Sequence, residues 1–140
     1  MKLLNLINKK VHIIGINGIG MSALAVYLKK NKINVSGSDI ASNSNTIILK
    51  KNGIPVQIGH RSSNVRGKDI IFFSTAIKDN PEIDAAKKRN IPFYNRSKLL
   101  QLICDDKFTI VVTGSHGKTT TTSMLGHLLV CSGLSPTIIT

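Results

Sequence analysis

The residues best equipped for chemistry lie in one short stretch, 114–122, which reads Gly-Ser-His-Gly-Lys followed by four threonines. Glycines allow backbone N–H groups to converge on an anion, and a helix that starts there adds partial positive charge. Lys118 supplies a mobile cation for β- and γ-phosphates, and Thr119 supplies a hydroxyl for Mg²⁺. The stretch therefore predicts an ATP-binding loop with Lys118 as its catalytic residue, formed by Gly114, Ser115, His116, Gly117, Lys118, Thr119 and Thr120.

This loop is shorter than the common G-x-x-x-x-G-K-[ST] signature, because Val112 occupies the position of the first glycine. The alternative is a glycine-rich turn between a strand and a helix that carries a lysine by chance. Four consecutive threonines disfavour a helix by propensity, so a purely structural turn would not select them. The pattern favours phosphate binding.

A second glycine stretch, 15–22, reads Gly-Ile-Asn-Gly-Ile-Gly-Met-Ser and also lies between an apolar run and a helical pattern. It is close to the dinucleotide fingerprint G-x-G-x-x-G, with Asn17 in place of the middle glycine; asparagine tolerates positive φ better than most residues. Asp39 follows roughly 20 residues later, where an acid that binds a ribose is expected. The pattern indicates a diphosphate site and leaves open whether the ligand is NAD(P) or another nucleotide.

Short apolar runs alternate with helical patterns along the whole chain, which is typical of a parallel sheet covered on both faces. The predicted strands are 11–16, 33–36, 55–58, 69–74, 91–94 and 108–113, with the start of another at 135–140. The predicted helices are 20–30, 43–52, 81–89, 97–104 and 119–132. We predict an α/β fold: a Rossmann-like parallel-sheet domain, followed by the first βαβ unit of a P-loop ATPase-type domain that the chain does not complete.

The boundary between these parts is predicted at the polar stretch Asp105-Asp106-Lys107. Residues 1–106 form the first domain, and residues 107–140 are too few to close a second domain alone. The sequence thus predicts a split, decayed or otherwise shortened product of a larger protein.

Composition limits the partners. The 140 residues carry a net charge of +12, but the lysines are scattered and aromatic residues make up only 4%, so stacking platforms for nucleic acid are scarce. No apolar run approaches the roughly 18 residues needed to span a bilayer, and the N-terminus lacks the features of a signal peptide. We predict no nucleic-acid partner, no membrane association and a cytoplasmic location; the charge fits phosphorylated small molecules.

Taken together, the motifs resemble the Mur ligase family, which builds the peptide stem of bacterial peptidoglycan. The motifs that carry the resemblance lie at 12–22, 36–39, 53–55, 59–60, 73–77, 79–82, 95–96 and 114–122. Within the family, His116 between two glycines is similar to the branch that uses L-alanine and to the branch that recycles murein tripeptide. Met21-Ser22 after Gly20 favours the former.

The resemblance implies a first domain that binds a UDP-sugar, a central domain that binds ATP and Mg²⁺, and a third domain. It implies that ATP phosphorylates the carboxylate of UDP-N-acetylmuramate and that the amine of L-alanine attacks the acyl phosphate. Lys118 would steady the phosphoryl group and Thr119 would hold Mg²⁺. The UDP-sugar contacts implied by the motifs are Gly18, Gly20, Met21, Ser22, Asp39, His60, Ser74 and Arg96.

Some of these residues have structural alternatives that the sequence leaves open. His60 is equally compatible with a turn, and Arg96 with an exposed charge at a helix start, while His12 fits a packed strand end. Because the L-alanine site is absent from the sequence, we expect the isolated chain to lack ligase activity and a second chain to be the partner that carries the missing domains. Three other interpretations remain: a stand-alone nucleotide- or UDP-sugar-binding module, a fragment of the murein-tripeptide recycling ligase, and an NAD(P)-binding Rossmann protein.

Overall fold

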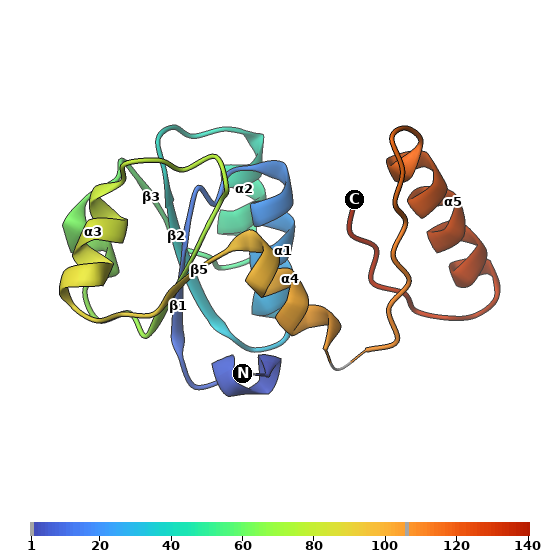
Figure 1. The fold of residues 1–140 in the computed structure, drawn as a ribbon, viewed down its shortest axis with the longest axis horizontal. Coiled ribbons are helices and arrows are strands. Elements are labelled where there is room, and N and C mark those ends of the chain that lie inside the picture. The colour runs from blue at the N-terminus through green and yellow to red at the C-terminus, as the bar shows by residue number, and fades with distance from the viewer. Residues whose placement is uncertain (1, 106) are drawn as a thin grey trace. The chain divides into compact units, whose positions relative to one another are not determined.

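A computed structural model describes residues 2–105 and 107–140, and Figure 1 shows the chain as a ribbon. The chain divides into two compact units, 1–107 and 108–140, which are described separately below. Asp106, in the predicted linker, lies outside the described residues.

The first unit contains a sheet in which every neighbouring pair of strands is parallel. Its strands, in the described part of the chain, are β1 (Lys10–Ile14), β2 (Asn34–Asp39), β3 (Val56–Ile58), β4 (Ile70–Phe73) and β5 (Phe93–Asn95). Their spatial order is β3-β2-β1-β4-β5, so β1 is central and the two halves of the sheet grow outward from β1 and β4. This arrangement confirms the predicted Rossmann-like α/β class.

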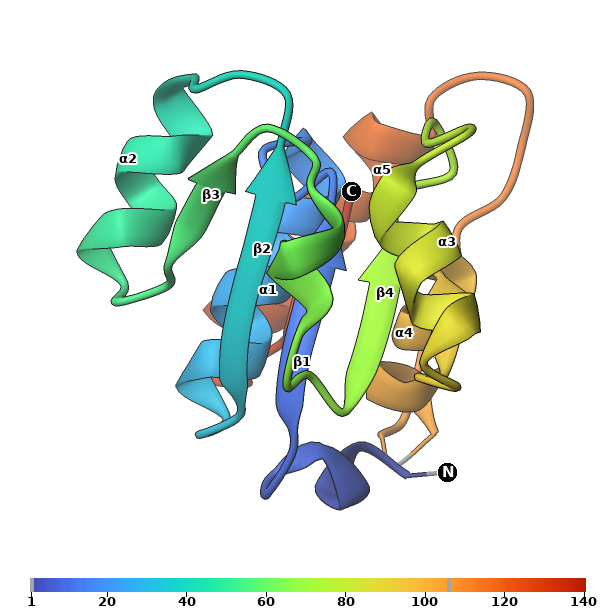
Figure 2. The same ribbon diagram turned by 90° about the vertical axis from the view of Figure 1, so that its left-hand side faces the viewer.

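Helices cover both faces of this sheet (Figure 2). They are α1 (Ile19–Lys30), α2 (Ser44–Lys51), α3 (Pro81–Lys88) and α4 (Arg96–Cys104), with short 3₁₀ helices η1 (Leu3–Leu6) and η2 (Ser62–Val65). α1 packs on β2 and α2, and α4 packs on β4 and β5, whereas α3 packs on η2. Figure 2 shows η2 and α3 in front of the sheet and α1 behind it. All four predicted helices of this part therefore form, with ends shifted by at most one residue.

Asparagine caps determine where three of these helices begin. The Asn43 side chain accepts hydrogen bonds from the backbone of Asn45 and Thr46, and the Thr46 hydroxyl accepts one from the Asn43 amide in return. The Asn80 side chain caps α3 by accepting from the Glu82 amide, and the Asn95 side chain caps α4 by accepting from the Lys98 amide. A side-chain oxygen at this position satisfies N–H groups that the first helical turn leaves free.

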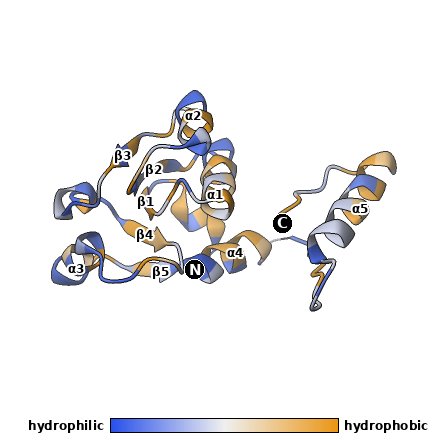
Figure 3. Ribbon diagram, turned by 90° about the horizontal axis from the view of Figure 1, so that it is seen from above, coloured by the Kyte–Doolittle hydropathy of each residue, from blue (hydrophilic) through white to orange (hydrophobic). Residues whose placement is uncertain are grey.

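The core follows from the apolar runs. Figure 3 shows hydrophobic residues along the strands of the sheet and on the helix faces turned toward it. Between the sheet and α3, Ile14, Val65 and Ile71 pack with Ala85 and Ala86. The central strand is buried on both sides, as its near-continuous apolar run predicts. His12 is the polar exception on that strand and is fully buried.

Strand ends differ from the sequence prediction where turn geometry intervenes. β1 ends at Ile14, before the predicted end at Ile16, because Gly15 has φ +76° and starts the turn. β5 is assigned from Phe93, later than predicted, although the carbonyl of Pro92 still accepts a hydrogen bond from Ile71. Proline lacks the N–H that a regular strand position needs.

The second unit corrects two predicted strands. Its helix α5 (Lys118–Cys131) forms as predicted, but the segments 108–113 and 135–140 are not strands in the described residues. A strand exists only through hydrogen bonds to a neighbouring strand, and this unit provides none for either segment. Instead the tail folds back, and the Ile138 side chain covers the buried Gly126 of α5.

No helix in the described part of the chain combines the length and the apolar character that a membrane span requires.

Candidate functional site

The carboxyl ends of β1 and β4 meet at the point where the strand order changes direction, which is where open parallel sheets bind ligands. β1 leads into the turn 15–18 and then α1, and β4 ends beside Ser74. The two strand ends lie close together, because a Cβ on Gly15 would be only 3.1 Å from the Cβ of Ser74. Gly15 thus meets two demands, a positive φ and a close neighbour.

The N-terminus of α1 opens toward this edge of the sheet. Its cap residue Gly18 has no side chain to bond the first N–H groups, and the first turn contains no acid. By helix geometry, the amides of this turn are free to bind an anion. Met21 and Ser22, by contrast, are buried, and the Ser22 hydroxyl donates to the carbonyl of Ile19 at 2.9 Å. The predicted contact of Met21 could therefore involve only its backbone in this conformation, whereas the Ser22 amide already donates to the carbonyl of Gly18 at 2.8 Å and is not free for a ligand.

The side chain of Arg96 lies against the same turn. A Cβ built on Gly20 would be 2.6 Å from Cζ of Arg96 and 2.7 Å from one of its terminal nitrogens. The buried Nε of Arg96 has no hydrogen-bond partner among the described residues. A guanidinium beside the positive end of a helix is unfavourable unless an anion neutralises both. The structure thus brings Gly20 and Arg96, residues far apart in the chain, into one positively charged arrangement that an anion could neutralise.

Asp39 has a different role in the structure from a free ribose ligand. Its Oδ2 accepts a hydrogen bond from the Asn17 amide at 2.7 Å, and its Oδ1 accepts one from the Ile40 amide at 2.8 Å. Both oxygens are engaged by backbone, so Asp39 holds the glycine turn in place. Its contact with a ligand stays a prediction.

Asn17 replaces the middle glycine for a reason other than positive φ. The turn residue with positive φ is Gly15, and Asn17 is not among the residues with positive φ. The side-chain Nδ2 of Asn17 donates to the carbonyl of Ala41 at 2.7 Å, while the backbone carbonyl of Asn17 accepts from the side chains of Asn43 and Asn45. Asn17 therefore ties the glycine turn to the start of α2.

His60 follows β3 at the same edge of the sheet. Its Nδ1 lies 3.3 Å from both the Ser38 hydroxyl and Oε1 of Glu82, and its buried Nε2 has no partner among the described residues. The residue is thus more than a turn residue, since its ring is held by a buried network.

Glu82 is the functional candidate that the sequence interpretation missed. It lies in the first turn of α3 and its side chain is fully buried. Burial alone raises the pKa of this carboxyl, but hydrogen bonds from His12, Ser38 and Asn64 outweigh that effect and lower the pKa to about 2. The one available sequence signal was an acid directly after a capping Asn-Pro pair.

Buried side-chain atoms without a partner gather at one edge. Among the described residues they are Oδ1 of Asn17, Nε2 of His60 and Nε of Arg96. These residues follow β1, β3 and β5, whose carboxyl ends lie on the same side of a parallel sheet. Buried polar atoms are normally hydrogen-bonded, so each of these atoms marks a point where a polar ligand could complete the bonding, with β3 and β5 at opposite sides of the sheet and β1 between them.

In the second unit, the loop before α5 has the backbone of an anion-binding turn. Gly114 has φ +151° and Gly117, the cap residue, has φ +75°; a Cβ on Gly117 would meet nothing within 4 Å. No acid lies in the first turn of α5, which contains Thr119 and Thr120. The loop is exposed and open to solvent.

The ammonium group of Lys118 folds back onto this loop. Its Nζ donates to the carbonyl of Gly114 at 2.6 Å and to the carbonyl of Ser115 at 3.2 Å. The loop thereby places the ammonium beside the backbone that would surround a phosphate. A phosphate group would exchange these carbonyl contacts for stronger charge-assisted ones.

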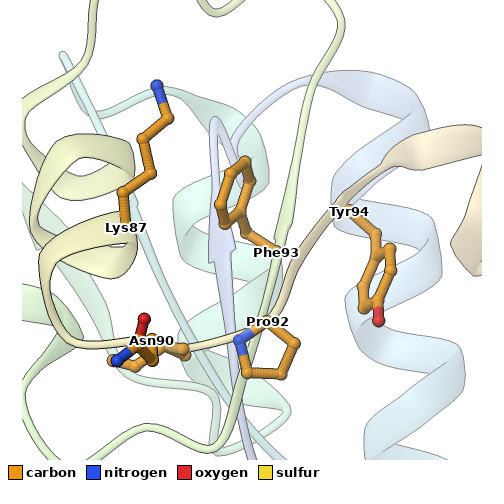
Figure 4. A pocket seen from close by; sticks show the side chains of 6 residues that line it. Lys87, Asn90, Pro92, Phe93 and Tyr94 are labelled. Atoms are coloured by element: carbon orange, nitrogen blue, oxygen red, sulfur yellow. The ribbon is translucent and has the colours of Figure 1, made fainter.

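A shallow pocket of about 490 Å³ lies elsewhere, where α3 leads into β5 (Figure 4). Its lining residues are Lys87, Asn90, Ile91, Pro92, Phe93 and Tyr94. Figure 4 shows Phe93 and Tyr94 pointing to opposite sides of the strand. The pocket lies at the amino end of β5 and contains none of the predicted site residues.

Comparison with known proteins agrees with this geometry. The family model described as Mur ligase family, catalytic domain, matches residues 10–108. A UDP-N-acetylmuramate–L-alanine ligase of Aquifex aeolicus is 50% identical over 132 residues, which cover 94% of this chain and 29% of the relative. The chain thus spans less than a third of the length of the curated relatives it matches.

Solved structures give the same relationship. A UDP-N-acetylmuramate-alanine ligase from Thermotoga maritima superposes with a TM-score of 0.81 and 39% identity, covering 88% of this chain and 29% of that one. A UDP-N-acetylmuramate:L-alanyl-gamma-D-glutamyl-meso-diaminopimelate ligase from Neisseria meningitides superposes with a TM-score of 0.85 and 29% identity, covering 94% of this chain and 43% of that one.

Proposed function

The chain belongs to the Mur ligase family, and we propose that it supplies the UDP-sugar-binding domain and the ATP loop of a UDP-N-acetylmuramate–L-alanine ligase. The residues 1–106 are the proposed UDP-sugar domain, and 107–140 are the proposed start of the ATP-binding domain. The reaction is the formation of an amide bond between the muramate carboxylate and L-alanine in peptidoglycan synthesis.

The observation that carries the proposal is the contact between Arg96 and Gly20 at the open N-terminus of α1. Two positive potentials face each other there, and a diphosphate would neutralise both. The proposed contacts of the UDP-sugar are the backbone of Gly18, Gly20 and Met21 with the side chains of Asp39, His60, Ser74 and Arg96. Ser22, also proposed, would have to exchange its present bonds to the carbonyls of Gly18 and Ile19 for such a contact. The geometry fits an anionic ligand better than a neutral one.

The residues of the second loop fit ATP and Mg²⁺. Gly114 and Gly117 leave room for a phosphate, and the Lys118 ammonium already lies among the loop carbonyls. Ser115, His116, Thr119 and Thr120 complete the proposed contacts, with the Thr119 hydroxyl as a ligand for Mg²⁺. ATP supplies the phosphoryl group that activates the carboxylate, and Lys118 would hold that group's charge at its Nζ.

A second candidate is the ligation of a preformed tripeptide to UDP-N-acetylmuramate. It is favoured by the superposition on the Neisseria structure at a TM-score of 0.85. The same sugar nucleotide would occupy the same edge of the sheet, so the two candidates differ only in the amine substrate. The cytoplasmic location and a partner chain with further domains stay predictions.

Binding measurements test the proposal. Calorimetric titration of the 140-residue chain with UDP-N-acetylmuramate, MgATP and NADH should show binding of the first two and none of NADH. Replacing Arg96 with alanine should weaken UDP-N-acetylmuramate at least about tenfold, because a desolvated charge contact is lost. Lys98→Ala removes an equal charge from the same helix and serves as the control, since the Lys98 ammonium bonds Gln101 of that helix and no other described residue. Binding of NADH without the sugar nucleotide would refute the assignment.

Amine specificity separates the two candidates. The chain is mixed with MgATP, the sugar nucleotide and either L-alanine or the murein tripeptide, and the release of ADP is measured. We expect no turnover with either amine from the isolated chain. Turnover that depends on all three substrates would contradict that expectation and would identify the amine directly.

A further inference from the structure

Glu82 brings together four separate elements of the first unit. Its Oε2 accepts hydrogen bonds from Ser38 of β2 at 2.7 Å and from Nε2 of His12 of β1 at 3.1 Å. Its Oε1 accepts from Asn64 of η2 at 2.7 Å and lies 3.3 Å from Nδ1 of His60. The backbone amide of Arg61 also reaches Oε1 at 3.3 Å. A buried charge is tolerated only with such complete hydrogen bonding.

The carboxylate dictates where each histidine carries its hydrogen. An ionised carboxylate has no hydrogen to donate, so any ring nitrogen that bonds it must be protonated. His12 therefore carries a hydrogen on Nε2, and His60 carries one on Nδ1. The two rings contact the same carboxylate through opposite nitrogens.

The far side of His12 is also occupied. Its Nδ1 lies 3.2 Å from the Ser36 hydroxyl, which accepts a hydrogen bond from Nζ of Lys68 at 2.8 Å. Because Lys68 donates to this oxygen, the Ser36 hydrogen has two acceptors within reach, Nδ1 of His12 at 3.2 Å and the carbonyl of Val11 at 3.4 Å, of which Nδ1 is the nearer. Every group on this side of Glu82 has a partner, and the network is closed.

On the far side of the His60 ring, Nε2 is covered by protein but has no hydrogen-bond partner among the described residues. With its hydrogen on Nδ1, the ring presents only a lone pair at Nε2. His60 keeps 12% of its side-chain area exposed and sits at the same edge of the sheet as Arg96 and the α1 turn. A ligand donor that bonds Nε2 must shift the ring or the loop 59–64, because Nε2 is covered in the ligand-free chain.

We propose that Glu82 is a positioning residue that holds His60 with its hydrogen on Nδ1, so that His60 offers a hydrogen-bond acceptor, and not a cation, to an N–H or O–H group of the sugar nucleotide. The inference rests on the proposed function for the identity of the ligand. The other groups of the proposed site attract anions. Nε2 of His60, as a hydrogen-bond acceptor, would favour ligands that carry an N–H or O–H group beside the diphosphate. UDP-N-acetylmuramate carries hydroxyl, acetamido and uracil donors, whereas pyrophosphate carries no sugar hydroxyl and no N–H group, and in its magnesium complex it has little P–OH to donate.

The protonation pattern is tested first, without any ligand. Nitrogen-15 NMR of the histidine-labelled chain near neutral pH distinguishes the two neutral forms of each ring. We expect His60 with hydrogen on Nδ1, His12 with hydrogen on Nε2, and the exposed His116 and His127 in averaged states. His60 with its hydrogen on Nε2, or doubly protonated, overturns the inference at this step.

Variants of Glu82 test the cause. In Glu82→Gln, the Arg61 amide and the Asn64 side chain still need an acceptor, so the glutamine oxygen faces His60 and the glutamine NH₂ faces His12. The hydrogen of His12 should therefore move from Nε2 to Nδ1, whereas His60 should keep its hydrogen on Nδ1. Glu82→Met removes both acceptors, and His60 should become an average of its two forms with about tenfold weaker binding of UDP-N-acetylmuramate. Ser36→Ala, at the closed end of the network, should change neither the His60 signal nor the affinity.

A variant of His60 tests the ligand role even if Glu82→Met fails to fold. His60→Asn keeps a donor near the position of Nδ1 but has no group at Nε2, so the fold is retained. Calorimetry should show about tenfold weaker binding of UDP-N-acetylmuramate and unchanged binding of pyrophosphate. Equal losses for both ligands would show that His60 acts as a cation and would overturn the inference. UDP as a third ligand locates the donor, since a loss with UDP places it on the uridine and no loss places it on the sugar.

The two proposals fail in different ways. A wild-type chain that binds no UDP-N-acetylmuramate refutes the proposed function and the ligand role of His60 together. The histidine forms fixed by Glu82 are measured in the free chain and are then still decided by the NMR result. Conversely, binding that is indifferent to His60→Asn refutes the further inference and leaves the proposed function standing.

Discussion

At the scale of single residues, the candidate site depends on a few polar side chains and on a glycine that leaves space for one of them. Gly20 makes room for the Arg96 guanidinium, which a Cβ would displace. Asp39 fixes the backbone of the neighbouring turn, and Glu82 fixes the ring of His60. Each of these roles comes from a contact between segments that are distant in the chain.

Gly20→Ala should weaken the binding of UDP-N-acetylmuramate about tenfold, because the new Cβ would lie 2.6 Å from Cζ of Arg96 and push the guanidinium away. Stability should change little, since the obstructed atoms belong to the end of a flexible side chain and alanine suits a helix better than glycine. Calorimetry on Gly20→Ala, Arg96→Ala and the double variant checks this. If the two effects add fully, Gly20 does not act through Arg96.

Glu82 should make the first unit acid-sensitive. Its pKa is about 2 in the folded chain against 4.5 for the free group. A lowered pKa stabilises the fold above about pH 4.5, and this contribution, on the order of 3 kcal/mol, disappears as the pH falls toward 2. Urea unfolding followed by circular dichroism at several pH values should show this loss in the wild type and not in Glu82→Gln. Asp84→Asn changes an exposed acid on the same helix and should keep the loss; equal slopes in all three chains would disprove the role of Glu82.

At the scale of elements, the starts of α1 and α2 are coupled. Asn43 caps α2 and also donates from its side chain to the carbonyl of Asn17 in the glycine turn. Asn45 donates to the same carbonyl at 2.8 Å. The helix that follows β2 therefore helps to shape the turn that follows β1.

Asn43→Ala should lower the free energy of unfolding by about 1 kcal/mol, the usual effect of losing a cap. It should also speed amide hydrogen exchange in the turn 15–18, because one tie to Asn17 is lost. Asn52→Ala at the other end of α2 removes a side chain whose bond, within the described part of the chain, goes to the carbonyl of Ile48, and it should leave exchange in that turn unchanged. Exchange that is equally fast in both variants would argue against the coupling.

At the scale of the whole molecule, the two units differ in what supports them. The first unit has a sheet, helices on both faces and a buried core, and it contains every proposed contact of the sugar nucleotide. The second unit has one helix and a tail, and many of its large apolar side chains are exposed, among them Phe108, Val111 and Met124. An exposed apolar surface of this kind offers little to hold a fold together.

A chain of residues 1–107 should fold cooperatively and bind UDP-N-acetylmuramate within about twofold of the 140-residue chain. Thermal unfolding and calorimetry on the two lengths provide the measurement. A large loss of affinity in the shorter chain would place part of the sugar-nucleotide site in 108–140.

A peptide of residues 108–140 should show little helix by circular dichroism. α5 has 14 residues and begins with four threonines within its first five positions, and isolated helices of about this length are marginal in water. Strong helicity in the free peptide would contradict this expectation.

The sequence by itself determined the parallel α/β class, the helices of the first unit and α5, and both glycine turns, because these depend on local periodicity, propensity and backbone freedom. It could not determine the strands at 108–113 and 135–140, since a strand requires a partner that only the folded unit supplies or withholds. It also missed Glu82, which looks like an ordinary helix-start acid until folding buries it beneath His12 and His60. Tertiary structure alone decided that Arg96 meets Gly20 and that Asp39 holds a turn, because such contacts join distant parts of the chain and leave no periodic trace in it.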